Sequence, residues 1–266
     1  MGKQLAASQV FRRLKPVAEP RVRLVCVPYA GGAASLFHAW GPALPHDVEL
    51  QAVQLPARQD RRREHAMTRV TAIVDVLAGA MTALPPVPTA IFGHSFGALV
   101  GFELARRLSA DGAPPFCLIA SARRAPHLPL AHPPLHKLPD TDFFAGMNRY
   151  CGTPWDRLRD PDLVELALPA LRADFEAIET FTYDARGPLD VSTVVLRGRR
   201  DTTMPLESAL AWGEVVSREI RLHEIDAGHF FVDTHRSWVL ERVTEALRTA
   251  PPTRVVRASD DNRGCG

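Results

Sequence analysis

The feature that most constrains this chain is a single serine between two glycines, placed between a strand pattern and a helix pattern. Residues 93–97 read Gly-His-Ser-Phe-Gly; a short apolar run precedes them, and apolar residues recur at helical spacing from Phe96 to Leu108. In this context a Gly-x-Ser-x-Gly motif predicts a nucleophile elbow, a strained turn between strand and helix. Glycine on both sides of Ser95 removes side chains that would collide with neighbouring backbone, so that the hydroxyl is exposed above the sheet.

The serine needs partners, because a hydroxyl becomes a useful nucleophile only beside a histidine base that a carboxylate orients. Asp201 follows a predicted strand, and His229 follows the next one. Their order after Ser95 is the order that elbow hydrolases use, and all three are predicted at the carboxyl ends of parallel strands. Asp226 is the rival carboxylate. We favour Asp201, because a group from a separate strand end can approach the imidazole Nδ1 from behind.

Two backbone amides are expected to bind the negative charge that develops on the substrate oxygen. One is that of Phe96, the residue after the nucleophile, and the other is near Ala30. Ala30 lies in the run Pro-Tyr-Ala-Gly-Gly at 28–32, where a strand ends in small residues that let amides approach a ligand. Without the elbow, this run would be read as a plain turn. The His94 side chain is expected to point away from the serine and to support packing.

Composition excludes several classes of protein. The 266 residues are 46% hydrophobic, and 32 basic residues nearly balance 30 acidic ones, so an electrostatic nucleic-acid binder is not expected. The four cysteines show no metal-ligand spacing, and the N-terminus has no apolar signal core. The uncharged run 76–102 is interrupted by three prolines, so it does not predict a membrane span. We therefore expect a cytoplasmic protein in a reducing compartment, without metal, redox cofactor or membrane.

Strand and helix patterns alternate along most of the chain, which predicts one α/β domain over residues 21–250. The alternation stops at about 125–190, where only helical patterns occur, at 142–148 and 163–182. Such an insertion above the elbow predicts a lid over the site; the alternative, a separate helical domain, has too few residues for much core of its own. Residues 1–20 are interpreted as a loosely held lead-in, and 251–266 as a disordered tail.

Six motifs together resemble those of type II thioesterases, the stand-alone editing enzymes of polyketide and nonribosomal peptide assembly lines, which are similar to the medium-chain thioesterases of fatty acid synthesis. Besides the elbow and the run at 28–32, they are Pro-Ala-Arg-Gln-Asp-Arg at 56–61, Ser-Ala-Arg-Arg-Ala-Pro at 121–126, Leu-Pro-Ala-Leu-Arg-Ala-Asp at 168–174 and Gly-His-Phe at 228–230. The resemblance covers about residues 20–248. The chain has Tyr29 where these enzymes usually have histidine, and we expect this change to alter packing rather than mechanism.

The resemblance implies an α/β-hydrolase fold, a mostly parallel central sheet flanked by helices, with a mobile helical lid. It implies Ser95, Asp201 and His229 as a catalytic triad, which would hydrolyse aberrant or stalled acyl groups from the phosphopantetheine arm of acyl or peptidyl carrier proteins. Because carrier proteins are generally acidic, we hypothesise that arginines at the site entrance steer docking of a carrier to this monomer. They are Arg58, Arg61, Arg62, Arg63, Arg123 and Arg124.

Two other functions are compatible with the same residues. A general serine carboxylesterase or peptidase acting on soluble small molecules would use identical chemistry, including an acyl-Ser95 intermediate. A hydrolase fold recruited as a non-catalytic ligand receptor is the third possibility, although such proteins often lose one triad member and this chain has a complete candidate set.

Overall fold

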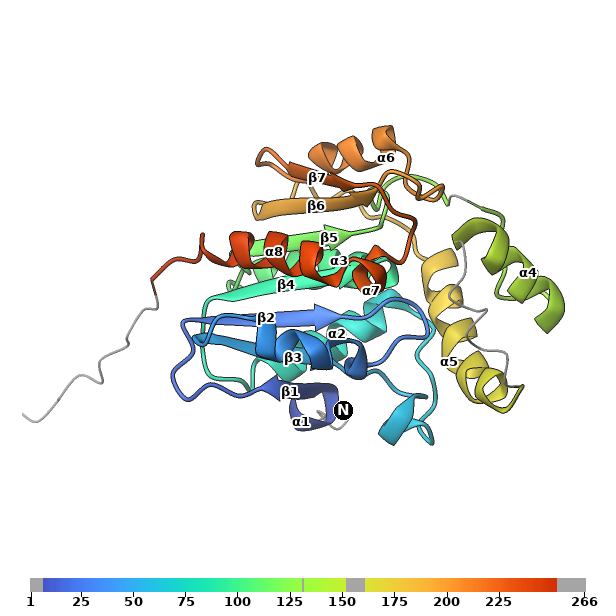
Figure 1. Cartoon of the computed structure of the whole chain (residues 1–266), viewed down its shortest axis with the longest axis horizontal. Helices are drawn as coiled ribbons and strands as arrows, with labels where there is room; N and C mark the ends of the chain where they lie inside the picture. The colour runs from blue at the N-terminus through green and yellow to red at the C-terminus, as the bar shows by residue number, and fades with distance from the viewer. Residues whose placement is uncertain (1–6, 131, 152–160, 253–266) are drawn as a thin grey trace, which may run out of the picture.

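A central sheet of seven strands runs through the part of the chain that the computed structural model describes, residues 7–130, 132–151 and 161–252 (Figure 1). Its strand order is β1-β3-β2-β4-β5-β6-β7. All neighbouring pairs are parallel except β1 and β3, which are antiparallel. The strands are β1 (Phe11–Lys15), β2 (Val22–Val27), β3 (Val48–Val53), β4 (Thr89–His94), β5 (Cys117–Ser121), β6 (Ser192–Gly198) and β7 (Arg221–Ile225). The predicted mostly parallel α/β sheet is thus confirmed.

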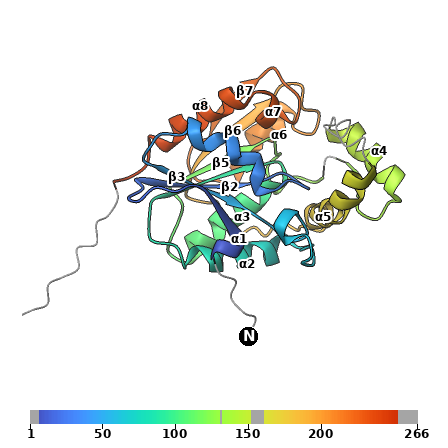
Figure 2. The same cartoon turned by 60° about the horizontal axis from the view of Figure 1, so that its bottom comes forward.

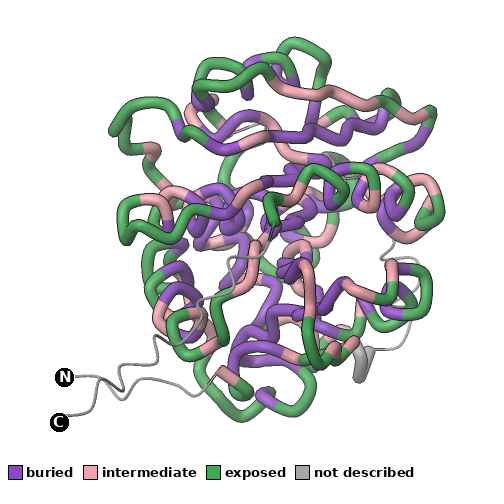
Figure 3. The backbone as a smooth tube through the Cα atoms, turned by 90° about the vertical axis from the view of Figure 1, so that its left-hand side faces the viewer, coloured by how far each residue is buried: buried purple, intermediate pink, exposed green. Residues whose placement is uncertain are grey.

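Helices cover both faces of this sheet (Figure 2), which explains why its central strands are apolar runs. On one face, Val25 packs in a cluster with α2 (Val70–Met81) and α3 (Phe96–Ala110). On the other, Leu24 and Cys26 pack with the 3₁₀ helix η1 (Ala34–Ala43) and with α8 (Arg236–Leu247). Successive side chains of a strand point to opposite faces, so each buried strand contributes to both clusters. Buried residues accordingly run through the interior of the molecule, with exposed residues toward its surface (Figure 3).

Shorter helical segments complete the described chain. They are α1 (Ala7–Val10), η2 (Gln59–Arg61), α6 (Leu206–Leu210), η4 (Ala211–Glu214) and α7 (Phe231–Thr234). Residues 206–214 are divided between α6 and η4, and the uncharged run that begins at residue 76 is divided among α2, β4 and α3. None of the helices in the described residues has the length and apolar character needed to span a membrane.

Two helices, α4 (Asp140–Cys151) and α5 (Pro161–Glu179), lie between β5 and β6 in the sequence, where helical patterns were predicted. They stand at the end of the sheet toward which the parallel strands point (Figures 1 and 2). Phe143 and Met147 of α4 pack against Leu171 and Phe175 of α5 in a small cluster of their own. We refer to α4 and α5 together as the helical insertion.

The N-terminal residues differ from expectation. Residues 11–15, which the sequence assigned to a loosely held lead-in, form β1 and pair with the edge of β3. Val10 and Phe11 are buried in the core beside α2, and this contact holds the segment in place. The predicted disordered tail at 251–266 lies almost entirely outside the described residues.

Candidate active site

Ser95 lies between the end of β4 and the start of α3, in the strained turn that the motif predicts. Its backbone has φ 55° and ψ −114°, which a non-glycine residue seldom adopts. The two glycines are required by close approach of backbone: a Cβ on Gly93 would lie 2.0 Å from the Gly97 carbonyl oxygen, and one on Gly97 would lie 2.1 Å from that of Val27. The Ser95 amide donates to the Ser121 carbonyl at 2.8 Å, which ties the turn to β5.

The structure brings Ser95, His229 and Asp201 together. The His229 Nε2 lies 3.0 Å from the Ser95 Oγ, and its Nδ1 lies 2.7 Å from the Asp201 Oδ2. His229 and Asp201 are buried, at 7% and 4% exposure. The rival carboxylate, Asp226, instead pairs with Arg200 on the surface. Each of the three residues follows a different strand of the sheet, β4, β6 or β7, which is why positions so far apart in the sequence meet.

Asp201 remains ionised at neutral pH. Burial raises the pKa of its carboxyl, but the charge of His229 and hydrogen bonds from His229 and Thr203 outweigh that effect, and the net pKa lies below the usual 3.8. Thr203 donates to the Asp201 Oδ1 from its amide at 2.9 Å and from its hydroxyl at 2.7 Å. These bonds leave Oδ2 directed at the imidazole, so the carboxylate can orient the ring and stabilise its protonated form.

His94 does more than support packing, which corrects the sequence interpretation. Its Nδ1 lies 2.9 Å from the Ser121 Oγ, and its Nε2 lies 2.9 Å from the carbonyl oxygen of His229. Because a carbonyl only accepts, Nε2 carries the proton and Nδ1 accepts from the Ser121 hydroxyl. Burial, helped by the nearby His229, lowers the pKa of His94 to about 3. A neutral His94 therefore holds the backbone of His229 in place.

The two amides predicted to form an oxyanion hole are those of Phe96 and Ala30. That of Phe96 belongs to the first residue of α3, whose N–H has no partner within the helix. That of Ala30 belongs to a turn over 29–32, closed by a 2.8 Å bond from the Gly32 amide to the Tyr29 carbonyl. Among the described residues, neither amide donates to a protein acceptor. Both are thus available to a substrate oxygen.

The turn at 29–32 is anchored by residues that the site prediction did not include. Asp174 of α5 accepts a 2.7 Å hydrogen bond from the Gly31 amide. Asp174 also forms a bidentate ion pair with Arg58, at 2.9 and 3.0 Å. Both residues lie in motif runs that the sequence singled out, 56–61 and 168–174, but no pattern in the sequence indicates that the two runs meet.

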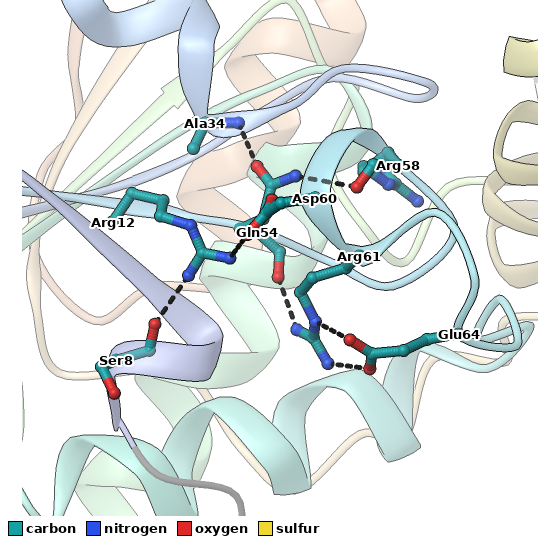
Figure 4. A network of polar contacts seen from close by, with 8 residues as sticks. All are labelled: Ser8, Arg12, Ala34, Gln54, Arg58, Asp60, Arg61 and Glu64. Atoms are coloured by element: carbon teal, nitrogen blue, oxygen red, sulfur yellow. Dashed lines mark hydrogen bonds and ion pairs between the residues drawn. The ribbon is translucent and has the colours of Figure 1, made fainter.

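Two of the six arginines proposed to steer docking are committed inside the protein, so that part of the hypothesis is wrong. Arg58 is 6% exposed and pairs with Asp174. Arg61 is 5% exposed; it pairs with Glu64 and donates to the carbonyl of Gln54 (Figure 4). In this run, only the two arginines after η2, at positions 62 and 63, are exposed.

Two cavities meet at the site and share Tyr29, Ala30 and Phe230. The first contains Ser95 and His229, has a volume of about 60 Å³, and extends under the helical insertion. Its apolar lining includes Leu130, Met147, Leu171, Phe175 and Ile178. The second has a volume of about 430 Å³ and is lined by the 29–36 loop, the 57–62 loop and α5. Its polar lining includes Ser35, Gln59, Arg62 and Asp233.

Comparison with known proteins agrees with this geometry. A family model described as "Thioesterase domain" matches residues 22–248. Thioesterase PikA5 of Streptomyces venezuelae is 37% identical over 252 residues, covering 93% of this chain and 89% of that protein. Gramicidin S biosynthesis protein GrsT of Aneurinibacillus migulanus is 34% identical over 229 residues, covering 86% and 90%. The solved structure of the type II thioesterase BorB, from the borrelidin biosynthetic cluster, has a TM-score of 0.83 and 34% identity, covering 90% of this chain and 98% of that one.

The family match extends over nearly the whole sheet and the helical insertion, from β2 to the end of α8. The elbow, the strand order and the serine beside a buried histidine are the arrangement of a serine hydrolase. The chain therefore belongs to the thioesterase family and is an enzyme of the α/β-hydrolase fold.

Proposed function

We propose that this protein is a stand-alone thioesterase that removes aberrant or stalled acyl groups from the phosphopantetheine arms of acyl or peptidyl carrier proteins, in the cytoplasm and as a monomer. The observation that carries the proposal is the hydrogen-bonded series Ser95–His229–Asp201 at the junction of two cavities. Relatives named for gramicidin S and borrelidin biosynthesis support the kind of pathway.

In the first half of the reaction, the Ser95 Oγ attacks the thioester carbonyl carbon and His229 Nε2 accepts the hydroxyl proton. The carbonyl oxygen becomes an oxyanion, which accepts hydrogen bonds from the amides of Ala30 and Phe96. Each such donor typically lowers the barrier by about 3 kcal/mol. The carbon–sulfur bond then breaks, His229 returns its proton to the leaving sulfur, and the acyl group remains on Ser95.

In the second half, His229 removes a proton from water, which attacks the acyl-Ser95 carbonyl. The same two amides bind the second oxyanion, and the proton passes to Ser95 as the carboxylic acid leaves. Asp201 stays ionised and stabilises the imidazolium in both halves. Water is the only co-substrate, so the proposed reaction uses no cofactor.

The two cavities suit the two parts of a carrier-bound thioester, the acyl chain and the phosphopantetheine arm. The narrow cavity under the helical insertion contains Ser95 and has apolar side chains of α5 in its lining, together with Arg123, Arg124 and His132, and we assign it to the acyl chain. The larger cavity, with hydroxyl, amide and charged groups in its lining, suits the amide-rich phosphopantetheine arm. Arg62 lines this second cavity and is exposed, so it is placed to meet the phosphate or the acidic carrier beyond it.

Intact-mass analysis of acylated carrier proteins tests the proposal. Carriers loaded with acyl groups of several lengths are incubated with the enzyme, and loss of the acyl mass is followed over time. We expect the free phosphopantetheinyl carrier to accumulate, and we expect Ser95→Ala to abolish this. Asp201→Asn keeps the shape of the site but presents the wrong group to the imidazole, and it should slow turnover by about 10⁴-fold.

The matched comparison uses p-nitrophenyl esters of the same acyl groups. A higher kcat/KM on these esters than on acyl carriers would identify a general esterase and overturn the carrier proposal. Failure of Ser95 to react with a fluorophosphonate probe would contradict the catalytic assignment itself. Reversal of charge at Arg62 and Arg63 should raise the KM for carrier substrates but leave that for a small thioester unchanged.

A further inference from the structure

The turn that carries Ala30 is held from the side opposite the substrate, by residues of the helical insertion and of the loop after β3. Gly31 has φ +73°, and with the bond between Gly32 and Tyr29 this makes 29–32 a type II turn. Such a turn can change type by rotating its central peptide, which links Ala30 to Gly31. Rotation would replace the Gly31 N–H with the Ala30 carbonyl. The Ala30 N–H belongs to the preceding peptide, so its position depends on whether the turn as a whole keeps its shape and place.

Asp174 opposes that rotation. Its Oδ2 accepts from the Gly31 amide at 2.7 Å, so a rotated peptide would place a carbonyl oxygen against a buried carboxylate. Close packing adds to this hydrogen bond. A Cβ on Gly31 would lie only 2.9 Å from the Leu171 Cδ1, so α5 lies directly against the turn. Leu171 and Asp174 are three residues apart and lie on one face of α5, so a single face of this helix fixes the turn.

Arg58 holds the other end of the same turn. Its guanidinium donates to the Gly32 carbonyl at 2.9 Å and to both oxygens of Asp174. Its own carbonyl accepts from the Gln54 side chain, whose oxygen in turn accepts from the Ala34 amide at 2.8 Å (Figure 4). The loop is thus fixed at Gly31, Gly32 and Ala34, which follow Ala30 directly in the chain.

We propose that Asp174 and Arg58 are positioning residues that keep the Ala30 amide in its oxyanion-binding place, and that they make this place depend on the seating of α5. The inference rests on the proposed role of Ala30. Because Asp174 belongs to α5 and Arg58 to the core, the oxyanion hole is complete only while the helical insertion is docked on the turn. Neither residue lines the cavity that contains Ser95, so neither touches the reacting atoms. Arg58 does line the second cavity, which the proposed function assigns to the phosphopantetheine arm.

The test separates positioning from stability. Asp174→Asn leaves Arg58 buried without a counter-charge and could unfold the insertion, so the informative variant is the double substitution Arg58→Met with Asp174→Leu. Apolar replacement of both members of a buried ion pair is often neutral for stability, but it removes the bonds to Gly31 and Gly32. Glu179→Gln is the matched control: Glu179 is a carboxylate of the same helix that holds the backbone at 135–136 and does not touch the turn.

The experiment would measure kcat and KM on an acyl-N-acetylcysteamine thioester. It would also measure the Tm and the inhibition by a trifluoromethyl ketone that mimics the tetrahedral intermediate. Displacement of a catalytic group by about 1 Å can cost 10²-fold, so we expect the double variant to lose about 100-fold in kcat with an unchanged KM. Affinity for the ketone should fall in parallel, whereas Glu179→Gln should retain wild-type kcat. Asp174→Glu, which can reach the same partners, should recover part of the loss.

Three results would overturn the inference. They are a folded double variant with wild-type kcat, a rise in KM alone, and a kcat loss without loss of affinity for the ketone. If the wild-type enzyme does not hydrolyse the thioester, the proposed function fails instead. The positioning role of Asp174 and Arg58 is then tested by the rate at which a fluorophosphonate labels Ser95. That reaction also develops negative charge on an oxygen bound in the oxyanion hole.

Discussion

At the scale of the residue, His94 shows how a side chain beside the nucleophile can serve the base. It is fully buried and hydrogen-bonded on both ring nitrogens, to Ser121 and to the carbonyl of His229. A second proton on the ring would break the bond from Ser121 and place a charge beside His229. Folding therefore requires His94 to be neutral, and this requirement makes stability depend on pH.

The sign of that dependence follows from the two pKa values of His94. The pKa is about 3 in the fold and 6.5 in the unfolded chain, so the unfolded state binds more protons between these values. Stability therefore falls as pH decreases below 6.5, by about 2 kcal/mol at pH 5. Asp201 does not contribute to this loss of stability, because its pKa lies below 3.8 and its carboxyl stays ionised at pH 5. We expect His94→Gln to reduce the pH dependence of the unfolding free energy by that amount, measured by urea denaturation at pH 7.5 and 5.

His38, which is exposed, provides the control. His38→Gln should keep the wild-type difference between the two pH values, since solvent reaches this ring in both states. A His94→Gln variant that loses stability at low pH as steeply as the wild type would show that other groups control the transition.

The residues of the site divide into those that the sequence can predict and those that it cannot. Ser95, Asp201 and His229 were predictable because each follows a strand, and parallel strand ends meet at one edge of a sheet. The contact of Asp174 with Gly31 was not, because it depends on how a helix of the insertion docks. Arg58 was misjudged as a surface charge for the same reason: burial of an arginine depends on a partner distant in sequence.

At the scale of the element, burial decides what a sequence reveals. The central strand β4 has helices on both faces, so it appears in the sequence as an apolar run before the elbow, where a strand was predicted. The edge strand β1 reads Phe-Arg-Arg-Leu-Lys and is polar at three of five positions, because it pairs with a neighbour along one edge only and most of its side chains are partly exposed. Its partner, β3, is more than thirty residues away, and no local pattern indicates that pairing.

The junction of β2 with α3 gives a prediction at this scale. A Cβ on Gly97 would lie 2.1 Å from the Val27 carbonyl oxygen and 2.7 Å from that of Pro28, and both atoms belong to backbone that cannot move independently. We expect Gly97→Ala to lower the unfolding free energy by about 3 kcal/mol and to displace the turn that follows Pro28. Chemical denaturation measures the first effect, and fluorophosphonate labelling of Ser95 the second.

Gly213 in η4 offers a matched control, because a Cβ there meets nothing within 4 Å. Gly213→Ala should leave both measurements near their wild-type values. If Gly97→Ala lowers the unfolding free energy and the labelling of Ser95 no more than Gly213→Ala does, small backbone shifts relieve the Gly97 contact.

At the scale of the whole molecule, β1 closes one edge of the sheet. It covers the exposed hydrogen-bonding groups of β3 and contributes Phe11 and Leu14 to packing on opposite faces. An uncovered strand edge is a template for association with another chain. The N-terminal segment thus shields β3 from pairing with another chain as well as stabilising the fold.

Deletion of residues 1–15 tests this role. We expect a lower Tm, because buried Val10 and Phe11 are lost, and concentration-dependent light scattering, because β3 becomes an edge. The point variant Arg12→Ala, which keeps the strand, should remain monodisperse. A truncated protein as stable and as monodisperse as the full chain would contradict the assigned role of β1.

The cavity that contains Ser95 adjoins a second cavity at Tyr29, Ala30 and Phe230, and in the proposed reaction this has a kinetic consequence. The thiol product can diffuse away along one route while the acyl half is still esterified and enclosed along the other. Release is then sequential, thiol first and acid second. Between the two events the vacated route is open to any incoming nucleophile, so a small exogenous thiol or amine can compete with water and convert hydrolysis into acyl transfer.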